Sequence, residues 1–473
     1  MHICYRNTSP VHWLLLFILM ALLPSGASAW MSKTAPPLPS PTGNVVSVST
    51  VSELEYAVAN IVSGTTIMVQ PGTYNLTHSL LFDGVDNVAI RGATGNRRDV
   101  ILAGKGMTVE SGKNTVPHVI MVWNVTDMLI ADMTLTGAWY HNVHMAGSAG
   151  PLRPRMYNVH SLDCGEQHLK VNPGSNPTAF PDSGRVEFCR FEFTDRARWY
   201  YTNGVDVLDG AGWVVSDCEF VRIRGPVGEM VGPAVLFWHN CMGTIVERCL
   251  LYECEFGIYL GLSNGDIVSK RDPDSQWDHH NGIIRNNVLY KARTSGDVGI
   301  SVNKSKNFAI YNNTVIQNGT YQHNIEYRAQ NSNGVIFNNL CDGPIFQRNS
   351  ATAELAGNIT VAQDSWFVDA DSMDFHLLPD CPAVDSAVVV DGLALDFDGE
   401  ARPWGAAADV GADEYQPPFE RWDINRDSRI NIFDVLEILK AIGTGSEDSW
   451  YDLDSNGKVN IFDLLEMLKL LKG

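Results

Sequence analysis

Basic residues are scarce in this chain of 473 residues. It contains 34 lysines and arginines against 54 aspartates and glutamates, which gives a formal net charge of −20. A predominantly negative surface repels phosphate backbones, so this balance argues against nucleic acid as the ligand. An anionic substrate would need a local patch of positive charge. The length allows one large domain and one small one.

Long hydrophobic runs are also missing, except near the N-terminus. Residues 11–23 (VHWLLLFILMALL) follow Arg6 and precede Ala-Ser-Ala at 27–29, which is typical of a signal-peptide cleavage site. The run is too short for a comfortable membrane span, and no later segment replaces it. We expect residues 1–29 to be a signal peptide, with an uncleaved anchor as the alternative, and residues 30–44 to be a proline-rich linker. The mature protein is then secreted or attached to the cell surface, without a membrane span.

Helical periodicity is nearly absent from residues 45–416, and this part has no phosphate-binding loop, nucleophile elbow or zinc-ligand spacing. Short β-branched runs recur instead, about every 30 residues, as in VVSDCEFV (214–221) and AIYNNTVI (309–316). Aligning the copies places nine residues in one column. They are Met133, Val159, Cys189, Cys218, Cys249, Asn287, Asn313, Asn339 and Asn358. A loose period of this length, built from strands alone, predicts a solenoid of stacked coils.

The column has a physical reason. In a parallel β-helix each coil lies ~4.8 Å above the last, so equivalent residues stack on one another. Buried asparagines at a turn hydrogen-bond above and below as a ladder, and cysteines fill the same position as small apolar side chains. We therefore expect Cys189, Cys218 and Cys249 to be free thiols, although the protein is exported. The state of Cys241 and Cys254 stays open.

In this pattern the chain resembles the right-handed parallel β-helix superfamily of pectate lyase-like proteins. The fold class predicted for residues 45–416 is therefore all-β, a right-handed parallel β-helix. The resemblance lies in the architecture and includes no catalytic signature. Residues 375–416 resemble the closing segment of exported bacterial β-helix proteins. We expect them to cap the open end of the solenoid, where exposed strand edges would aggregate.

A second set of strands lies between the ladder turns, and its alternation predicts which side chains face outward. One outward column reads His144, Lys170, Asp206, Leu236, Tyr259, Ser301 and Glu326. The first three fall on neighbouring coils, so their side chains can converge, and they are the catalytic candidates. Six more residues suit an anionic polysaccharide, because aromatic rings stack on sugars and arginine grips carboxylate or sulfate. They are Trp238, His239, Tyr259, Arg198, Arg222 and Arg224.

Two chemistries fit these residues. β-Elimination on a uronic acid neutralises the carboxylate and then needs a base for the C5 proton, a role for Lys170 with His144 or an arginine assisting. Glycoside hydrolysis needs two carboxylates across the bond, for which Asp206 with Asp209 or Glu229 is available. We favour a lyase acting on an acidic polysaccharide. A non-catalytic glycan-binding or adhesion module is the alternative from another class, and a calcium ion in the groove is left open.

Simpler explanations exist for two of these features. Lys170 and Asp206 on adjacent coils also fit a surface ion pair without a function. The neighbours Asp278, His279 and His280 suggest a metal site, but in a long loop over 262–281 we expect them to be solvated.

Two copies of one pattern close the chain, at residues 423–434 and 452–463. Oxygen-bearing side chains fall at loop positions 1, 3, 5, 9 and 12, and the backbone carbonyl of position 7 adds a ligand, as in a calcium loop. The twelve predicted ligand residues are Asp423, Asn425, Asp427, Arg429, Asn431, Asp434, Asp452, Asp454, Asn456, Lys458, Asn460 and Asp463. Each loop leads into a run with apolar residues at helical spacing, whereas proline and glycine stand where an entering helix would be. Two calcium sites are therefore expected.

A duplicated calcium loop with an exiting helix resembles a type I dockerin, here over residues 423–473 after a short linker at 417–422. The resemblance implies a module that needs calcium to fold and that binds a cohesin-like partner on a scaffold or cell surface. A calcium-stabilised cap that folds back on its own chain is the alternative. Two features depart from the family. Ser428 stands where Gly457 supplies the loop glycine of the second copy, and loop positions 10 and 11, which help to choose the partner, are Ile-Phe in both copies, whereas many members carry Ser or Thr.

Overall fold

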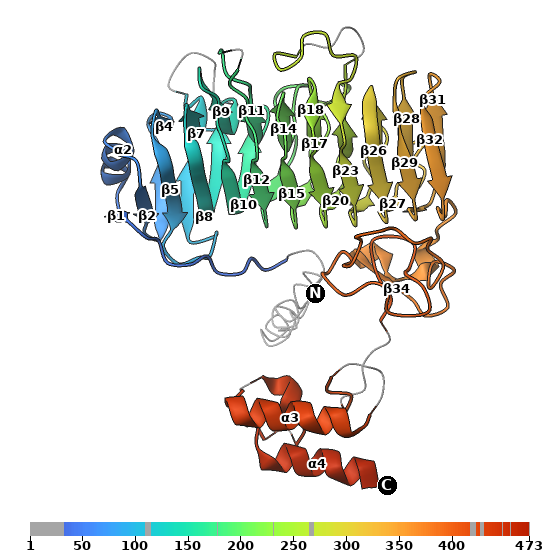
Figure 1. Cartoon of the computed structure of the whole chain (residues 1–473). Coiled ribbons are helices and arrows are strands. Elements are labelled where there is room, and N and C mark those ends of the chain that lie inside the picture. The colour runs from blue at the N-terminus through green and yellow to red at the C-terminus, as the bar shows by residue number, and fades with distance from the viewer. Residues whose placement is uncertain are drawn as a thin grey trace, which may run out of the picture. The chain divides into compact units, whose positions relative to one another are not determined.

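The structure is a computed structural model. It describes residues 33–108, 115–176, 178–229, 231–263, 269–416, 422–425, 430–446, 448–454 and 456–472. The predicted signal peptide therefore lies outside the described residues, as do Asp427 and Arg429 of the first calcium loop. The chain divides into two compact units, Met1–Glu414 and Tyr415–Gly473 (Figure 1), which are described separately.

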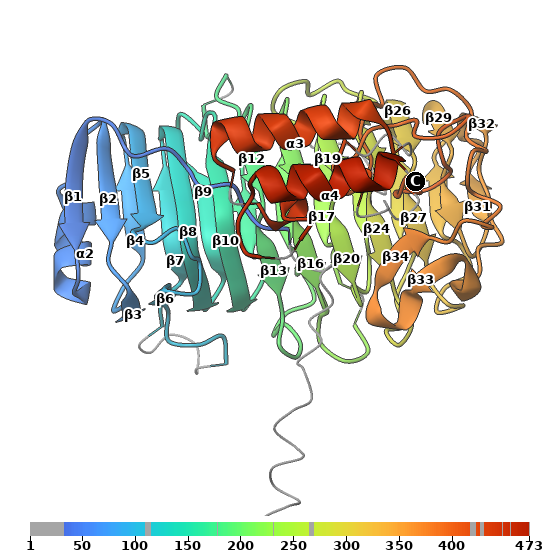
Figure 2. The same cartoon turned by 90° about the horizontal axis from the view of Figure 1, so that it is seen from below.

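The first unit is a right-handed parallel β-helix, and this confirms the predicted fold class. Its strands succeed one another from the end that carries helix α2 (Val51–Ala59) to the end that carries β31 and β32 (Figures 1 and 2). One face is a parallel sheet of ten strands. In spatial order they are β4 (Leu80–Asp83), β7 (His118–Trp123), β9 (His141–Ala146), β11 (Leu169–Val171), β14 (Val205–Leu208), β17 (Val235–Trp238), β21 (Ile258–Leu260), β25 (Ile300–Asn303), β28 (Ile325–Arg328) and β31 (Ile345–Arg348).

The remaining parallel strands form a joined sheet of 22 strands that contains two long rows. The first row is β1 (Asn44–Val48), β2 (Thr65–Val69), β5 (Asp86–Gly92), β8 (Thr126–Ala138), β10 (Arg155–Cys164), β12 (Arg185–Glu187), β15 (Val214–Ser216), β19 (Ile245–Glu247), β23 (Ile283–Arg285), β26 (Ser305–Tyr311), β29 (Asn333–Phe337) and β32 (Thr352–Ala356). The second row is β3 (Gly72–Asn75), β6 (Val100–Ala103), the far halves of β8 and β10, β13 (Arg190–Glu192), β16 (Glu219–Val221), β20 (Leu250–Tyr252), β24 (Val288–Tyr290), β27 (Thr314–Ile316) and β30 (Leu340–Cys341). The short strands β18 (Cys241–Met242) and β22 (His279–His280) pair beside β26.

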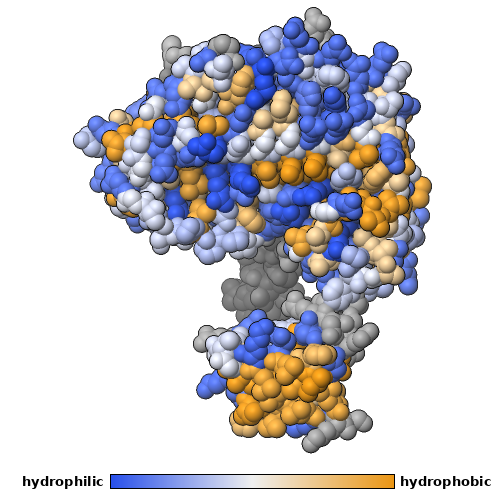
Figure 3. Space-filling view, viewed as in Figure 1, coloured by the Kyte–Doolittle hydropathy of each residue, from blue (hydrophilic) through white to orange (hydrophobic). Residues whose placement is uncertain are grey.

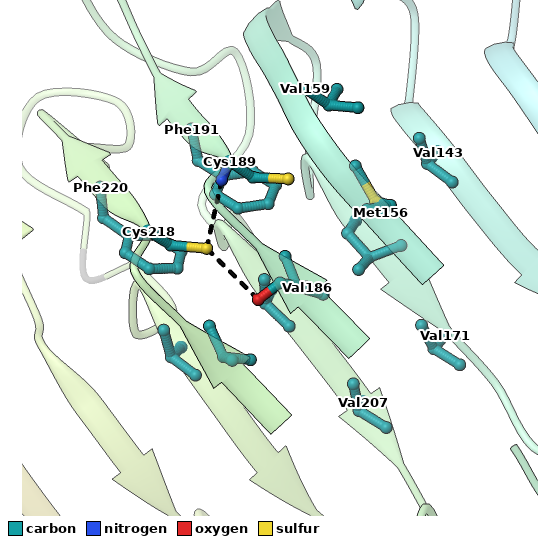
Figure 4. Close-up of a cluster of buried hydrophobic side chains, with 14 of the residues drawn as sticks. Val143, Met156, Val159, Val171, Val186, Cys189, Phe191, Val207, Cys218 and Phe220 are labelled. Carbon is teal, nitrogen blue, oxygen red and sulfur yellow. Dashed lines mark hydrogen bonds between the residues drawn. The ribbon is translucent and has the colours of Figure 1, made fainter. Parts of the chain in front are cut away.

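The predicted ladder column is present, and its members touch across successive coils. The side-chain amide of Asn287 donates to Oδ1 of Asn313, that of Asn313 to Asn339, and that of Asn339 to Asn358, each over 2.9 Å. Toward the N-terminus the same column holds cysteines, and the backbone N–H of Cys189 donates to Sγ of Cys218 over 3.4 Å (Figure 4). Stacked asparagines and packed cysteine sulfurs thus occupy the same position in different coils.

All eight described cysteines are buried and free. This confirms the prediction for Cys189, Cys218 and Cys249, and it resolves Cys241 and Cys254, which are also unpaired thiols. Burial in the apolar interior raises the pKa of the Cys254 thiol to about 12. These thiols therefore act as small core side chains.

The two segments that flank the coils differ from expectation. The expected linker packs on the body instead, because the Arg91 guanidinium donates to the carbonyl of Pro39 over 2.8 Å and Lys33 forms an ion pair with Asp217 over 3.3 Å. The expected cap, which contains the antiparallel pair β33 (Phe367–Asp369) and β34 (Asp374–Leu377), lies along the flank. Three turn asparagines on successive coils donate to its carbonyls, namely Asn286, Asn312 and Asn338. These contacts correct the expectation of a cap across the open end.

Helix α2 covers the N-terminal end of the β-helix. Thr50 caps it, because its hydroxyl accepts from the N–H of Glu53 while the Glu53 carboxylate accepts from the N–H of Thr50. Leu54 and Val58, four residues apart on one helical face, are buried in the main core. The other open end of the solenoid carries no comparable helix in the described part of the chain.

The second unit contains two helices, α3 (Ile432–Thr444) and α4 (Ile461–Lys472), with the short 3-10 turn η5 (Ser449–Tyr451) between them. Each helix places one apolar face in a shared small core. That core consists of Ile424, Val435, Ile438, Leu453, Leu464 and Met467. No helix of the described residues is both long and apolar enough to cross a membrane.

Candidate functional site

The ten-stranded face brings the three catalytic candidates into one row. Lys170 on β11 lies in register with His144 on β9 and with Asp206 on β14. The same row continues through Leu236 and Tyr259, in the order that the alternation of inward and outward residues predicts. The sequence therefore located this column correctly, whereas the roles of its residues remain a prediction.

Lys170 and Asp206 form the centre of a buried polar network. The Lys170 ammonium donates to Oδ2 of Asp206 over 2.5 Å and to the Tyr201 hydroxyl over 2.8 Å. Tyr201 in turn donates to the same Oδ2 over 2.7 Å, and the indole N–H of Trp238 donates to Oδ1 over 2.9 Å. Lys170 is 7% exposed and Asp206 is 0% exposed. The predicted ion pair is therefore present but buried, and an ion pair without a function remains the alternative.

Tyr201 is a member of this network that the sequence analysis did not single out. It lies outside the strands, just after the loop 196–200, so the alternation along the strands does not predict its position. Its closeness in sequence to Arg198 was the one available signal. Burial raises the pKa of its phenol, and the negative charge and hydrogen bond of Asp206 raise the pKa further. Tyr201 therefore keeps its proton and can act as a donor beside Lys170.

His144 lies between this network and a pair of histidines, His118 and His141. Its Nε2 is 2.9 Å from the amide nitrogen of Asn172, and its ring centroid is 4.8 Å from that of His118 and 5.1 Å from that of His141. Burial, followed by the positive charge of Lys170, lowers the pKa of His144 to about 4. The imidazole is therefore neutral at pH 7.

The aromatic candidates divide into two groups. Trp238 and His239 remain half-buried with ring centroids 4.1 Å apart, so one edge of this pair reaches the surface. Tyr259 is 3% exposed and packs with Leu236 and Phe256 in an apolar cluster against which Trp238 also packs, so its ring is not available to a sugar. This corrects its predicted role as a substrate contact. Burial lowers the pKa of His239.

Arg198, one of the three predicted arginines, acts on the same carboxylate as Lys170, that of Glu166. Its guanidinium stacks on the Trp139 ring at 3.8 Å and donates to the Trp139 carbonyl over 2.7 Å. Burial raises the pKa of Glu166, and the positive charges of Arg198 and Lys170 offset part of that rise. Arg198 thus adds positive charge near Lys170.

Arg222 and Arg224 already donate to other groups of the protein. Arg222 follows β16 in the joined sheet, where it forms an ion pair with Glu192 over 2.5 Å and donates to the carbonyl of Phe193 over 2.9 Å. Arg224 donates to the carbonyl of Asp195 over 3.3 Å. The prediction that these two arginines contact substrate beside Lys170 is therefore not supported by their partners.

The hydrolase arrangement does not fit these partners. Asp206 is neutralised by Lys170, and the carboxylate of Asp209 accepts from the Ser269 hydroxyl over 2.6 Å and from the N–H of Lys270 over 2.9 Å. Glu229 lies exposed in a turn. An inverting or retaining pair needs one carboxyl group that can donate a proton and one that can attack or activate water. Among the described residues no group of three acidic side chains lies at Asp206, and the groove calcium stays a prediction.

The histidines of the loop at 262–281 are not solvated as expected. His279 and His280 form the short strand β22, and His279 is buried, with its Nε2 2.8 Å from the Thr244 hydroxyl. Asp278 is also buried, and its carboxylate accepts from the N–H groups of His239 and Leu262, each over 2.7 Å. These residues therefore hold the loop in place.

The two calcium loops have equivalent geometry where both are described. The position-12 carboxylates, Asp434 and Asp463, accept from the N–H of position 3 over 3.1 and 3.2 Å and from the N–H of position 9 over 2.7 Å in both copies. The position-9 side chains, Asn431 and Asn460, cap the helices by accepting from the N–H two residues on, over 2.8 and 2.9 Å.

The chemistry of this donor set suits calcium. Asp434 and Asp463 are both fully buried, and among the described residues no lysine or arginine forms an ion pair with either of them. Carboxylate oxygens of Asp452, Asp454 and Asp463 all lie within 4.8 Å of one another. Two of these three carboxylates, Asp452 and Asp463, are buried, so a cation would offset their lost solvation, and oxygen ligands in this spacing select calcium.

Residues 421–472 match the family model for the Dockerin type I domain. The chain therefore carries a type I dockerin at its C-terminal end. Type I dockerins bind calcium, which agrees with the donor set of the two loops. The match covers the second unit, so it identifies that unit and leaves the β-helix to be argued from its own residues. No curated protein matches the sequence.

Solved structures with a similar fold include two lyases and an adhesin. Pectate lyase Pel9A is 14% identical, with a TM-score of 0.49, over 79% of this chain and 96% of that chain. An alginate lyase from Paenibacillus sp. str. FPU-7 is 13% identical, with a TM-score of 0.33, over 66% and 97%. PfbA, a surface adhesin of Streptococcus pneumoniae, is 12% identical, with a TM-score of 0.42, over 67% and 92%. Such likenesses do not distinguish an enzyme from an adhesin.

Proposed function

We propose that this is an exported, carbohydrate-active protein whose β-helix cleaves an acidic, uronate-containing polysaccharide by β-elimination. The observation that carries the proposal is the network of Lys170, Tyr201 and Asp206 on the outer face of the ten-stranded sheet. It combines a base candidate, a proton donor and a buried counter-charge within hydrogen-bond distance. Arg198 adds a cation that can bind the uronate carboxylate.

In this proposal Lys170 takes the C5 proton as a neutral amine. Asp206 is 2.5 Å away and can hold the proton that Lys170 gives up before the reaction. The short contact gives the proton a direct path between the two side chains.

The remaining proton movement is short. When the C5–H bond breaks toward Lys170, the C4–O bond breaks and a C4=C5 double bond forms. The leaving oxygen needs a proton, which the Tyr201 phenol can donate. Lys170 lies 2.8 Å from the phenolic oxygen and can return the proton it took from C5. The net result is transfer of one proton from C5 to the leaving group.

A screen of the mature protein against uronate-containing polysaccharides tests this activity. Unsaturated products absorb in the ultraviolet, whereas hydrolysis yields only new reducing ends, so both signals are followed in the same reactions. Ultraviolet absorbance that rises together with reducing ends supports elimination. Reducing ends without absorbance would replace elimination by hydrolysis.

A non-catalytic glycan-binding module is the second candidate, and one observation favours it. Lys170 and Asp206 satisfy each other's hydrogen bonds, as a purely structural ion pair does, while Tyr140, Trp199 and Tyr200 stand exposed in the neighbouring loops. Exposed aromatic rings bind sugars without chemistry. Retention of the protein on a polysaccharide that it does not cleave would support this candidate.

We further propose that the dockerin binds two calcium ions, one in each loop, and attaches the protein to a cohesin-like partner on a scaffold or cell surface. The exposed residues at loop positions 10 and 11 support a docking face, since Phe433 and Phe462 are each 59% exposed and Ile432 and Ile461 stand beside them. Figure 3 shows a largely hydrophobic surface on this unit. Binding assays against recombinant cohesins, with and without calcium, test this attachment.

A further inference from the structure

Three histidines gather on the ten-stranded face, one strand away from Lys170. His118 is the first residue of β7, and His141 and His144 lie on the adjacent strand β9. The strand register pairs His118 directly with His141, and their rings stack with centroids 5.1 Å apart at an interplanar angle of 16°. His144 closes the triangle at 4.8 and 5.1 Å from the other two rings.

We propose that His118, His141 and His144 bind a divalent transition-metal ion of the zinc class. Each offers one ring nitrogen, and these three atoms all lie within 4.8 Å of one another. The Nδ1 atoms of all three rings are buried and have no hydrogen-bond partner among the described residues. Unpartnered buried polar atoms are uncommon, and three of them in one cluster indicate a missing shared partner.

The donor set selects the class of metal. Neutral imidazole nitrogen suits zinc, copper, nickel and iron, whereas calcium and magnesium prefer oxygen ligands. Burial lowers the pKa of His118 to about 3 and, with the charge of Lys170, that of His144 to about 4. The rings are therefore neutral at pH 7, and a metal ion would displace no proton from them.

One of the three rings, His144, has an outer partner within hydrogen-bond distance, and His141 has a carboxylate nearby. The Asn172 side chain is 2.9 Å from Nε2 of His144, and a carboxylate oxygen of Glu166 is 4.0 Å from Nε2 of His141. When the Asn172 amide presents its oxygen, Nε2–H of His144 donates to it and Nδ1 keeps its lone pair for a metal. Such a partner fixes the tautomer and orientation of a ligating histidine.

Closing the site requires only small ring movements. Zinc–nitrogen bonds of ~2.0–2.1 Å in a tetrahedron separate the nitrogens by roughly 3.4 Å, somewhat less than the present upper limit of 4.8 Å. Lys170 is a nearby cation, but its charge is balanced by Asp206 at 2.5 Å. Three histidines leave a fourth position of the tetrahedron for water or a ligand oxygen, which is the arrangement of an open site.

The test uses the full mature chain, stripped of transition metals and then kept in excess calcium so that the dockerin loops are filled. Zinc is titrated by calorimetry, and copper is added to a separate sample for electron paramagnetic resonance. We expect one zinc ion per chain and a copper signal split by three nitrogen nuclei. The eight described cysteines are buried, so they do not compete for the metal. No zinc uptake, or a copper signal without nitrogen splitting, would show that the cluster is only a packed group of neutral rings.

Variants assign the bound metal to these residues. His141→Ala and His118→Ala should each weaken zinc binding at least ~100-fold, and Asn172→Ala about 10-fold, because outer partners contribute less than ligands. His280→Ala is the matched control, since this half-buried histidine lies on β22 in the other sheet, where its Nε2 is 2.5 Å from Oδ1 of Asn240. Circular dichroism confirms that each variant is folded. Equal zinc affinity in the wild type and in the two ligand variants would overturn the proposal, and it would do so whether or not the protein is a lyase.

Discussion

The side-chain amide of Asn313 donates to Oδ1 of Asn339 over 2.9 Å, and the backbone N–H of Asn313 donates to the same oxygen over 3.1 Å. One coil below, Asn287 makes both bonds to Asn313. Each asparagine side chain therefore accepts hydrogen bonds from the turn of one neighbouring coil and donates one to the turn of the other. This repeated pair of bonds explains why asparagine recurs in the column where the coil must turn inside the core.

Asn313→Ala should lower the free energy of unfolding by about 2–4 kcal/mol, because it leaves buried backbone groups of the neighbouring turns without partners. Chemical denaturation followed by fluorescence measures the change. Asn331→Ala is the matched control, since Asn331 is exposed and its side chain reaches only Gln276 over 3.3 Å. Equal stability of the two variants would contradict the ladder as a source of stability.

Cys218→Ala should cost roughly 1–2 kcal/mol of stability through the small cavity that the lost sulfur leaves. The Sγ atom lies between two coils and donates to the carbonyl of Val186 over 3.4 Å (Figure 4). The disulfide content should not change. Thiol titration of the denatured wild type without reductant checks this expectation. A disulfide at Cys218 would show that the assignment of stacked free thiols is wrong.

Removing calcium should unfold the dockerin while the β-helix persists. Asp434 and Asp463 are fully buried carboxylates, and their lost solvation opposes folding without a cation, as does the repulsion of Asp463 by the nearby Asp452 and Asp454. Far-ultraviolet circular dichroism of the full chain measures the effect. The helical signal, to which α3 and α4 contribute, should fall when a chelator is added. Calorimetry should count two calcium ions in the wild type and one in Asp463→Ala, with Asp391→Ala as a remote control. A helical signal that is unchanged by the chelator would contradict calcium-dependent folding.

Phe433→Ala combined with Phe462→Ala should weaken cohesin binding more than either single change. The two phenylalanines occupy the same loop position in the two copies and are equally exposed, so each copy can offer a docking face. Surface plasmon resonance with a cohesin that binds the wild type gives the comparison. Phe346→Ala, an exposed phenylalanine in the other unit, is the control. Undiminished binding by the double variant would place the docking face elsewhere.

The sequence predicted the fold well because a solenoid repeats its local pattern. Asparagine and cysteine recur in one column, as at Asn313 and Cys218, and the alternation along each strand correctly predicts that Lys170 lies beside Asp206. Burial was harder to predict, since strand alternation distinguishes outward from inward but does not show what the loops cover. Tyr259 points outward and is nevertheless buried by Leu236 and its neighbours.

Contacts between distant loops could not be read from the sequence. Arg222 and Arg198 looked equivalent, because each belongs to a short basic stretch near the same strands. The structure separates them, since Arg222 pairs with Glu192 in the joined sheet whereas Arg198 stacks on Trp139 near Lys170. Likewise, the three histidines of β7 and β9 had no recognisable metal-ligand spacing. Their closeness arises from the register of two parallel strands.

The central claim is that Lys170 acts as a base on a uronate. The most direct measurement is the initial rate of ultraviolet absorbance on the polysaccharide that the protein cleaves, compared between the wild type, Lys170→Ala and the control Lys306→Ala, which alters a lysine of the joined sheet. A lone Asp206 would be a buried unpaired charge costing about 3–5 kcal/mol, so Lys170→Met with Asp206→Leu is measured as well. The account predicts a rate at least ~1000-fold lower in both Lys170 variants, with folded protein and an unchanged control. A double variant that is folded and still produces unsaturated products at the wild-type rate would contradict it.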